Sequence, residues 1–295
     1  MRFVIGGASG FLGAPLVSHL RSHGHDVTRL VRGATDDADA SPWNPVQHEV
    51  DEALIGDADV VVNLSGAPIQ QWPRTKKRGA EILNSRRHAT ATLASAVAKA
   101  AKPPVFLSGS GMSWYGTDRG AEVLDESSGP GDGFLAGVAQ AWEDAARPAL
   151  EAGGRVAFLR TSIVLDDEGG ALRLMKVPFS LGLGAKLGAG DQYFSVISRH
   201  DWIRAVAFLA TSDVSGPVNL AAPQTPTNAE FTRALAAALG RPAVLTAPSF
   251  ALRRALGGLS EDLLGSLQVK PDALTAAGFT FDDPTIEAIL TRGLR

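Results

Sequence analysis

The sequence predicts an α/β fold, with a doubly wound parallel sheet and a small, mainly helical C-terminal lobe. Up to about residue 160, short apolar segments typical of strands alternate with amphipathic helical patterns. Such alternation indicates parallel strands covered by helices. The rhythm stops after Leu165, where glycine-rich segments and short helical patterns take over. That change predicts the separate lobe.

The first strand, near residues 2–5, leads into the glycine pattern G-x-x-G-x-x-G at Gly7, Gly10 and Gly13. This spacing is typical of a Rossmann-type dinucleotide site. The first glycine permits a sharp turn, the second lets backbone approach a pyrophosphate, and the third lets the next helix pack on the sheet. A helix expected near 11–23 points its N-terminal N–H groups at the phosphates. We expect cofactor contacts at Gly7, Ser9, Gly10, Phe11, Leu12 and Gly13; the alternative is a strand–turn–helix that binds nothing.

A second strand, near 26–31, ends in Val31-Arg32-Gly33, and this ending bears on the choice of cofactor. An acid there would bind the adenosine 2′-hydroxyl and repel a 2′-phosphate, whereas a guanidinium suits a phosphate. Val31 and Arg32 therefore favour NADP(H) over NAD(H), unless Arg32 is an ordinary exposed arginine. Residues 33–47 are expected to form a mobile polar loop around one apolar residue, Trp43.

Further strands are expected near 59–64, 104–108 and 155–160, with helices near 75–101 and 134–152. The small-residue run that ends the strand at 59–64 would let ribose and phosphates approach at Leu64, Ser65 and Gly66; a plain turn is the alternative. A strand near 193–197, a helix near 200–211 and a strand near 217–220 should return to the sheet. Asp201 is expected to cap that helix.

We accordingly expect a Rossmann domain at 1–225, with 166–195 contributing to the substrate cleft, and a C-terminal lobe at 226–295. The chain has 295 residues, 28 basic and 31 acidic side chains and a net charge of −3. These totals favour small ligands over nucleic acid or a membrane. The absence of cysteine and of paired-histidine motifs argues against a metal site. No apolar stretch approaches the ~20 residues that span a bilayer, so a cytoplasmic location is expected.

Several stretches give a more specific resemblance. They are Trp43-Asn44-Pro45, Asn84-Ser85-Arg86, Trp114-Tyr115-Gly116, 131–136, Trp142-Glu143, 181–184, 227–231 and 277–279. Together with the glycine pattern, they resemble an atypical extended short-chain dehydrogenase/reductase of the branch labelled "epimerase family protein", sometimes "cell-division inhibitor SulA-like". The resemblance spans nearly the whole chain and includes that branch's small C-terminal domain of unknown function, about 247–294.

The usual chemistry of short-chain dehydrogenases requires a tyrosine, a lysine four residues later, and a serine that polarises the substrate oxygen. The chain has two tyrosines, Tyr115 and Tyr193, and neither forms Y-x-x-x-K. If Glu143 serves as the landmark on the helix that bears the pair, the two positions fall on Leu135 and Ala139. The standard triad is absent. Ser110 and Tyr115 remain as catalytic candidates, with a turn hydrogen bond and an aromatic plug as the respective alternatives.

The resemblance also implies cofactor contacts beyond the glycine loop. It places Arg86 near a phosphate or ribose, Glu81 near adenine or ribose, and Val164 near the nicotinamide. The basic residues Lys76, Lys77 and Arg78 oppose the dipole at their helix's N-terminus, which invites a binding explanation or a solvated face.

The expected function is thus an NADP(H)-binding oxidoreductase or nucleotide-sugar-epimerase-like protein with an unidentified small substrate. The alternative is a non-catalytic NADPH-sensing regulator that binds a protein partner, consistent with the cell-division label.

Overall fold

The computed structural model describes residues 1–69, 75–257 and 259–294. The chain divides into two compact units. The first comprises 1–111, 137–159 and 206–217, and the second comprises 112–136, 160–205 and 218–295. The second unit draws on residues on both sides of position 225, so the compact units divide the chain differently from the expected boundary.

A seven-stranded sheet has the order β11-β7-β5-β4-β1-β2-β3. Its strands are β1 (Arg2–Gly6), β2 (Asp26–Arg32), β3 (Ala40–Trp43), β4 (Val60–Asn63), β5 (Val105–Gly111), β7 (Val156–Thr161) and β11 (Gly216–Leu220). The pairs β1–β2, β1–β4, β2–β3 and β4–β5 are all parallel. The strand β4 is buried along its whole length, as expected where both faces of a parallel sheet are covered. The predicted Rossmann-type fold is confirmed.

The edge strand β3 corrects the sequence interpretation of residues 33–47. Residues 40–43 are not loop but pair in parallel with β2, and Arg32 lies opposite Trp43 in the register. The Trp43 side chain is buried and packs into the core of the first unit. Its burial explains why one large apolar residue stands in an otherwise polar segment.

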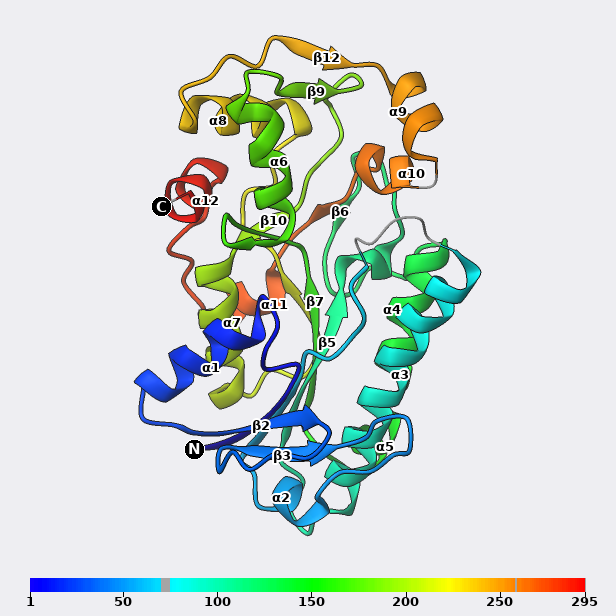
Figure 1. Cartoon of the computed structure of the whole chain (residues 1–295), viewed down its shortest axis with the longest axis vertical. Coiled ribbons are helices and arrows are strands. Elements are labelled where there is room, and N and C mark those ends of the chain that lie inside the picture. Colours follow the sequence, from blue (N-terminus) through cyan, green and yellow to red (C-terminus); the bar gives the residue numbers. More distant parts are fainter. Residues whose placement is uncertain (70–74, 258, 295) are drawn as a thin grey trace. The chain divides into compact units, whose positions relative to one another are not determined.

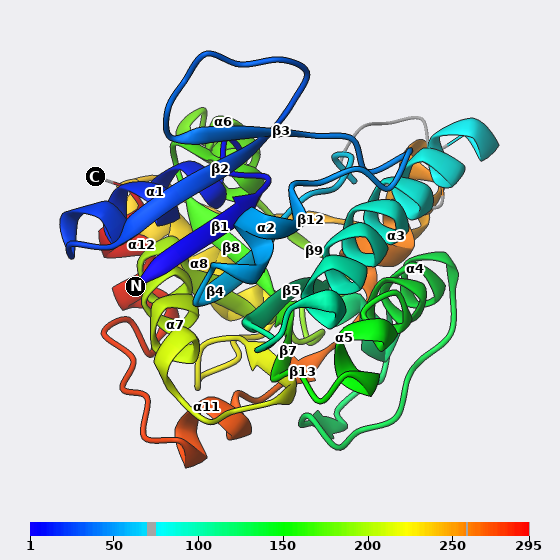
Figure 2. The same cartoon turned by 90° about the horizontal axis from the view of Figure 1, so that it is seen from below.

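Helices cover both faces of the sheet in the first unit. On one face, α3 (Lys76–Lys99) packs against α2 (Glu52–Gly56) and α5 (Arg147–Glu151), while α1 (Gly13–Ser22) lies on the other face (Figures 1 and 2). The single helix expected at 134–152 is instead α4 (Phe134–Asp144) followed by α5. Pro148 lies in the first turn of α5, the position where proline's missing N–H costs least.

The second unit combines short strands and helices, and its three two-stranded sheets are all parallel. The glycine-rich stretch at 181–191 contains the strand β9 (Ala185–Leu187), which pairs with β12 (Leu245–Ala247; Figure 1). No helix among the described residues is long and apolar enough to cross a membrane. The elements are the 3-10 helix η1 (Met112–Tyr115), β6 (Val123–Leu124), β8 (Ile163–Asp166), α6 (Gly170–Ser180), β9 (Ala185–Leu187), β10 (Val196–Ser198), α7 (Arg199–Thr211, continuing into the first unit), α8 (Asn228–Ala238), β12 (Leu245–Ala247), α9 (Ser249–Leu256), α10 (Leu259–Leu264), β13 (Gln268–Val269), α11 (Asp272–Ala276) and α12 (Ile286–Gly293).

The close approach of α1 to the glycine loop yields a stability prediction. A Cβ on Gly13 would lie 2.2 Å from the Gly7 carbonyl oxygen, whereas a Cβ on Gly137, in α4, would meet nothing within 4 Å. We expect Gly13→Ala to lower the free energy of unfolding by about 1–3 kcal/mol through forced backbone displacement. Gly137→Ala should raise it by roughly 0.5–1 kcal/mol. Denaturant unfolding of the two variants checks both signs, and equal effects would contradict the packing role of Gly13.

Candidate functional site

The carboxyl ends of three adjacent strands form the framework of the candidate site. Gly6 on β1 lies opposite Asn63 on β4, and Asn63 lies opposite Ser108 on β5. The Asn63 amide donates to Thr90 at 2.8 Å and accepts from the Ser65 N–H at 3.1 Å, which fixes the turn that leaves β4. Ligands of open parallel sheets bind at this edge.

The glycine loop has the shape expected for a pyrophosphate cradle. Gly7 has φ +80°, and a Cβ there would lie 2.6 Å from the Leu64 backbone. Gly10 differs, because it is exposed and a Cβ there would meet only the Gly7 carbonyl oxygen, at 3.3 Å. The fold therefore requires Gly7 and Gly13, while Gly10 leaves open space on the outer side of the loop.

The start of α1 supports the same interpretation. Leu12 occupies the N-cap position and supplies no side-chain hydrogen bond to the first turn, and Ser9 just before it is exposed. Uncapped N–H groups at a helix N-terminus favour an anion. The residues present thus fit the diphosphate of a dinucleotide.

Arg32 and Arg29 lie at the end of β2 but differ in their partners. Arg29 pairs with Asp37, and Arg21 pairs with Asp39 at 3.0 Å, so both loop acids are held by arginines. Arg32 is exposed, and its guanidinium makes no ion pair within the described part of the chain. The end of β2, with Val31 half-buried beside it, therefore presents a free cation.

Arg86, on α3, is a buried cation next to the turn that follows β4. Its side chain is 6% exposed, and its Nη1 donates to the carbonyl oxygens of Ala67 at 3.0 Å and Ile82 at 3.1 Å. Its Nε has no hydrogen-bond partner among the described residues, and the guanidinium lies 4.8 Å from the centre of the Trp142 ring.

Burial, and to a smaller extent the charge of Arg78, lowers the pKa of Arg86 to about 10. A buried charge that no carboxylate neutralises costs free energy, so this position favours an anionic ligand. Gly66 is small for a reason the sequence did not reveal: a Cβ there would lie 2.9 Å from the Arg86 Cζ.

Glu81 lies five residues before Arg86 on α3 and pairs with Arg78 at 2.7 Å. Arg78 also donates to the Pro68 carbonyl oxygen at 2.6 Å. The basic start of α3 is therefore partly explained by contacts within the protein, and Thr75 caps the helix by accepting from the Arg78 N–H. The Glu81 side chain is 56% exposed, so it remains accessible to a ligand.

Ser110, near the end of β5, forms a buried pair with Glu143 of α4. The Ser110 hydroxyl donates to Glu143 Oε1 at 2.7 Å, and the two residues are 5% and 7% exposed. Because its proton is directed to the carboxylate, Ser110 presents acceptor lone pairs rather than a donor. In the sequence, Glu143 serves only as a landmark for the helix. Its place in the family-like stretch Trp142-Glu143 is the signal that could have identified it as a site residue.

Tyr115 and Val164 belong to the second unit. Tyr115 is fully buried, and its hydroxyl lies 2.7 Å from Asn219 Oδ1 and 2.9 Å from the Asp125 carbonyl oxygen while accepting from Arg160 at 3.1 Å. Burial raises the pKa of the Tyr115 phenol. These contacts favour the aromatic-plug alternative. Val164 lies on β8, and its place near the nicotinamide stays a prediction.

The structure shows that Asp201 does not cap the helix α7, contrary to the expectation from the sequence. The helix α7 begins at Arg199, and Ser198 accepts from the Asp201 N–H. The Asp201 carboxylate accepts instead from the backbone N–H groups of Asp282 and Asp283 and from Arg204. It therefore ties a distant loop to the helix.

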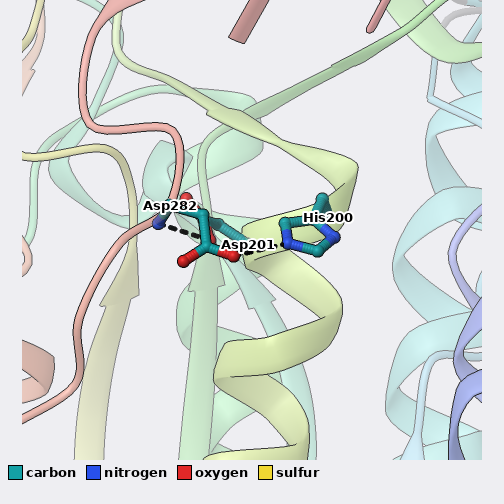
Figure 3. A group of neighbouring side chains, drawn as sticks. All are labelled: His200, Asp201 and Asp282. Atoms are coloured by element: carbon teal, nitrogen blue, oxygen red, sulfur yellow. Dashed lines mark hydrogen bonds and ion pairs between the residues drawn. The ribbon is translucent and has the colours of Figure 1, made fainter. Parts of the chain in front are cut away.

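His200, Asp201 and Asp282 bring potential metal-ligand atoms within 4.8 Å of one another (Figure 3). The protein's own groups already use these atoms: His200 Nε2 lies 2.8 Å from Asp282 Oδ2, and Arg204 lies 2.7 Å from Asp201 Oδ1 and 3.2 Å from Asp282 Oδ1. The hydrogen bond with His200 lowers the pKa of Asp282. The cluster acts as a structural ion-pair network.

Comparison with known proteins agrees with this geometry. Residues 3–132 match the NAD dependent epimerase/dehydratase family, and residues 247–292 match a domain of unknown function, DUF1731. The epimerase family protein Mb2239 of Mycobacterium bovis is 42% identical over 96% of this chain and 94% of its own. The human epimerase family protein SDR39U1 is 33% identical over 98% of both chains. This chain belongs to the epimerase family of atypical short-chain dehydrogenases/reductases.

Solved structures support the fold of this epimerase-family protein. The crystal structure of human SDR39U1 (isoform 2) with NADPH aligns with a TM-score of 0.87 and 31% identity over 99% of both chains. A nucleoside-diphosphate sugar epimerase from Corynebacterium glutamicum aligns with a TM-score of 0.82 and 34% identity, over 100% of this chain and 58% of that one.

The buried guanidinium of this epimerase-family protein gives a second prediction. Arg86→Met keeps an apolar stem against Trp142 but removes the charge. We expect it to weaken NADPH binding by about tenfold or more, because a charge-assisted contact is lost, without a large drop in melting temperature. Arg87→Met, at the exposed neighbouring position, is the control and should change neither. Fluorescence titration with NADPH and thermal unfolding measure both quantities; unchanged affinity in Arg86→Met would remove Arg86 from the site.

Proposed function

We propose that this protein is an NADP(H)-dependent oxidoreductase or epimerase-like enzyme that acts on a small molecule. The observation that carries the proposal is the buried guanidinium of Arg86 beside the turn that follows β4, which no carboxylate of the described residues neutralises. Its position, together with the open outer side of Gly10, supports an anionic dinucleotide at this sheet edge. The NADPH in the human SDR39U1 structure, at 31% identity, supports the same class of cofactor.

Preference for NADP(H) over NAD(H) is part of the proposal and depends on the end of β2. Arg32 has no acidic partner among the described residues, whereas Arg29 and Arg21 engage the nearby acids. A free guanidinium there suits the 2′-phosphate, with Val31 beside the adenosine. Glu81, Leu64 and Ser65 are proposed as further cofactor contacts.

Reversing the charge at residue 32 tests this preference. Arg32→Asp should lower the ratio of NADPH to NADH affinity by about tenfold or more, because a carboxylate repels the 2′-phosphate and accepts from a 2′-hydroxyl. The exposed Arg2→Asp, at the opposite end of the sheet, is the control for net charge. Titration with both nucleotides gives the ratio, and an unchanged ratio would exclude Arg32 from recognition.

The Ser110–Glu143 pair is the group we propose for proton handling. When bound, a nicotinamide supplies or accepts a hydride. Ser110 would accept the hydrogen bond, and then the proton, of a substrate hydroxyl while passing its own proton to Glu143. This role suits the direction of the 2.7 Å hydrogen bond and takes the place of the absent tyrosine and lysine. A carboxylate that acts through a hydroxyl belongs to ordinary general base catalysis.

The test is turnover of carbonyl compounds with NADPH and of secondary alcohols with NADP+, both followed through the NADPH absorbance. Nucleotide sugars are followed by separating the epimers, because epimerisation returns the hydride to the substrate and leaves no net change in the cofactor. For any compound that reacts, Glu143→Gln should lower kcat by about 10²-fold or more while leaving NADPH affinity unchanged. The control is Glu151→Gln, at an exposed position of α5. Full activity in Glu143→Gln would assign the proton to another group, and Tyr115 would then be the remaining candidate.

A non-catalytic NADPH sensor with a protein partner is the second candidate function. The internal hydrogen bonds of Tyr115 favour the sensor. They engage the phenol of η1, the short helix that directly follows β5, and so oppose its use as a proton donor to a substrate. Tight NADPH binding without turnover across the panel would select the sensor. A cytoplasmic location stays a prediction.

A further inference from the structure

The second unit carries several exposed apolar side chains on the helices α6 and α9 and on the segments that lead into β9 and β12. We call it the apolar surface, and define it by Leu174, Val177, Leu181, Leu183, Val244 and Phe250. These side chains are 67%, 60%, 70%, 59%, 87% and 75% exposed, respectively. Single exposed leucines are ordinary, but a group on neighbouring elements marks an interaction surface.

The elements that carry the apolar surface are adjacent within this unit. Leu174 and Val177 lie one turn apart on α6, whose C-terminus leads through Leu181 and Leu183 into β9. The strand β9 pairs with β12, with Ala185 opposite Leu245 (Figure 1). Val244 directly precedes β12, and Phe250 follows it at the start of α9. A Gly188 Cβ would lie 2.5 Å from the Ser249 Oγ, so α9 begins against the β9 turn.

The segments that carry the apolar surface, counted together with most of the preceding helix α8, are rich in basic residues. Residues 169–190 and 231–260 contain seven lysines and arginines and no acidic residue, which leaves 21 of the 28 basic side chains elsewhere against all 31 acidic ones. One of the seven, Lys176, pairs with Asp167. Arg253 and Arg254 are exposed on α9, and Arg241 is exposed before β12. The net charge of −3 for the whole chain does not show this uneven distribution of charge, so the overall composition gives no sign of the basic surface.

The positive charge and the high exposure of the apolar surface together indicate which kind of partner binds there. A second copy of this chain would place two basic surfaces face to face, which like-charge repulsion disfavours. Side chains exposed by 59–87% protrude, whereas side chains that line a small-molecule pocket are largely covered. Protruding leucine, valine and phenylalanine among arginines are typical of segments that lie in the interface of an anionic bilayer.

We propose that this surface docks the protein on anionic lipid bilayers as a peripheral membrane protein. Phe250 and the leucines enter the boundary between headgroups and acyl chains, and Arg241, Arg253 and Arg254 contact lipid phosphates. None of these residues belongs to the proposed cofactor or proton-handling groups. Four of the six apolar residues lie in the segment 166–195 that was expected to contribute to the substrate cleft, so the tests below use Phe250, Arg253 and Arg254, which lie outside it.

Vesicle flotation with the purified full-length protein tests the proposal. We expect binding to phosphatidylcholine vesicles that contain about a third phosphatidylglycerol, weak binding to pure phosphatidylcholine, and loss of binding as salt screens the charges. Phe250→Ser should release the protein from the anionic vesicles, whereas Leu150→Ser, which removes a 45% exposed leucine of α5 in the other unit, should not.

Removal of two positive charges from α9 provides a second, independent test of membrane binding. Arg253→Ala with Arg254→Ala should weaken vesicle binding by about 30-fold, since each basic residue near an anionic surface contributes roughly a factor of five. Arg147→Ala, at an exposed position of α5, is the control. Retained NADPH affinity and melting temperature in every variant exclude misfolding as the cause.

Absence of binding to anionic vesicles at low salt would overturn the proposal and make an acidic protein the better partner. Equal binding to neutral and anionic vesicles, or equal effects of Phe250→Ser and Leu150→Ser, would overturn it as well. None of these outcomes depends on turnover, so they are distinguishable from failure of the proposed function.

Discussion

The parallel register of β1, β4 and β5 is the constraint on which the rest of the candidate site depends. It aligns Gly6, Asn63 and Ser108 across three strands, so β1 and β4 end at one level while β5 continues three residues further, to Gly111. The glycine loop, the turn held by Asn63 and the Ser110 hydroxyl follow from that alignment. Because a shift by one residue would turn every side chain of a strand to the other face, the buried valines of β4 also hold the site in place.

The buried cation on α3 carries a cost in the stability of the free protein. Without an anion, Arg86 is neutralised by no carboxylate among the described residues and is stabilised only by two carbonyl oxygens and the face of Trp142. A ligand that binds the folded state alone raises its stability in proportion to the logarithm of the ligand concentration. An anionic cofactor at this position would therefore offset a cost that is built into the free protein.

The sequence predicted the features that depend on local chemistry. The glycine spacing, the apolar strands and the end of β2 each have a physical reason that can be read from neighbouring residues, and the expected family is confirmed. It did not predict β3, because Ser41 and Pro42 give that edge strand little apolar pattern and Trp43 is buried by a tertiary contact. The Ser110–Glu143 bond joins residues 33 positions apart, and the Asp201 contacts with the 282–283 loop span 81 and 82 positions. Such pairings are invisible without the fold.

The contact between Gly66 and Arg86 has a consequence for the evolution of the family. The guanidinium occupies the space that any side chain at position 66 would need, with Cζ 2.9 Å from the place of a Cβ, and hydrogen bonds keep Arg86 from moving aside. A larger residue at 66 requires Arg86 to shift or to be replaced by a shorter residue, and a shorter residue at 86 leaves a void that a larger one at 66 can fill. The two positions should therefore change together between relatives, with a compensating pair of substitutions as the permitted route away from the present combination.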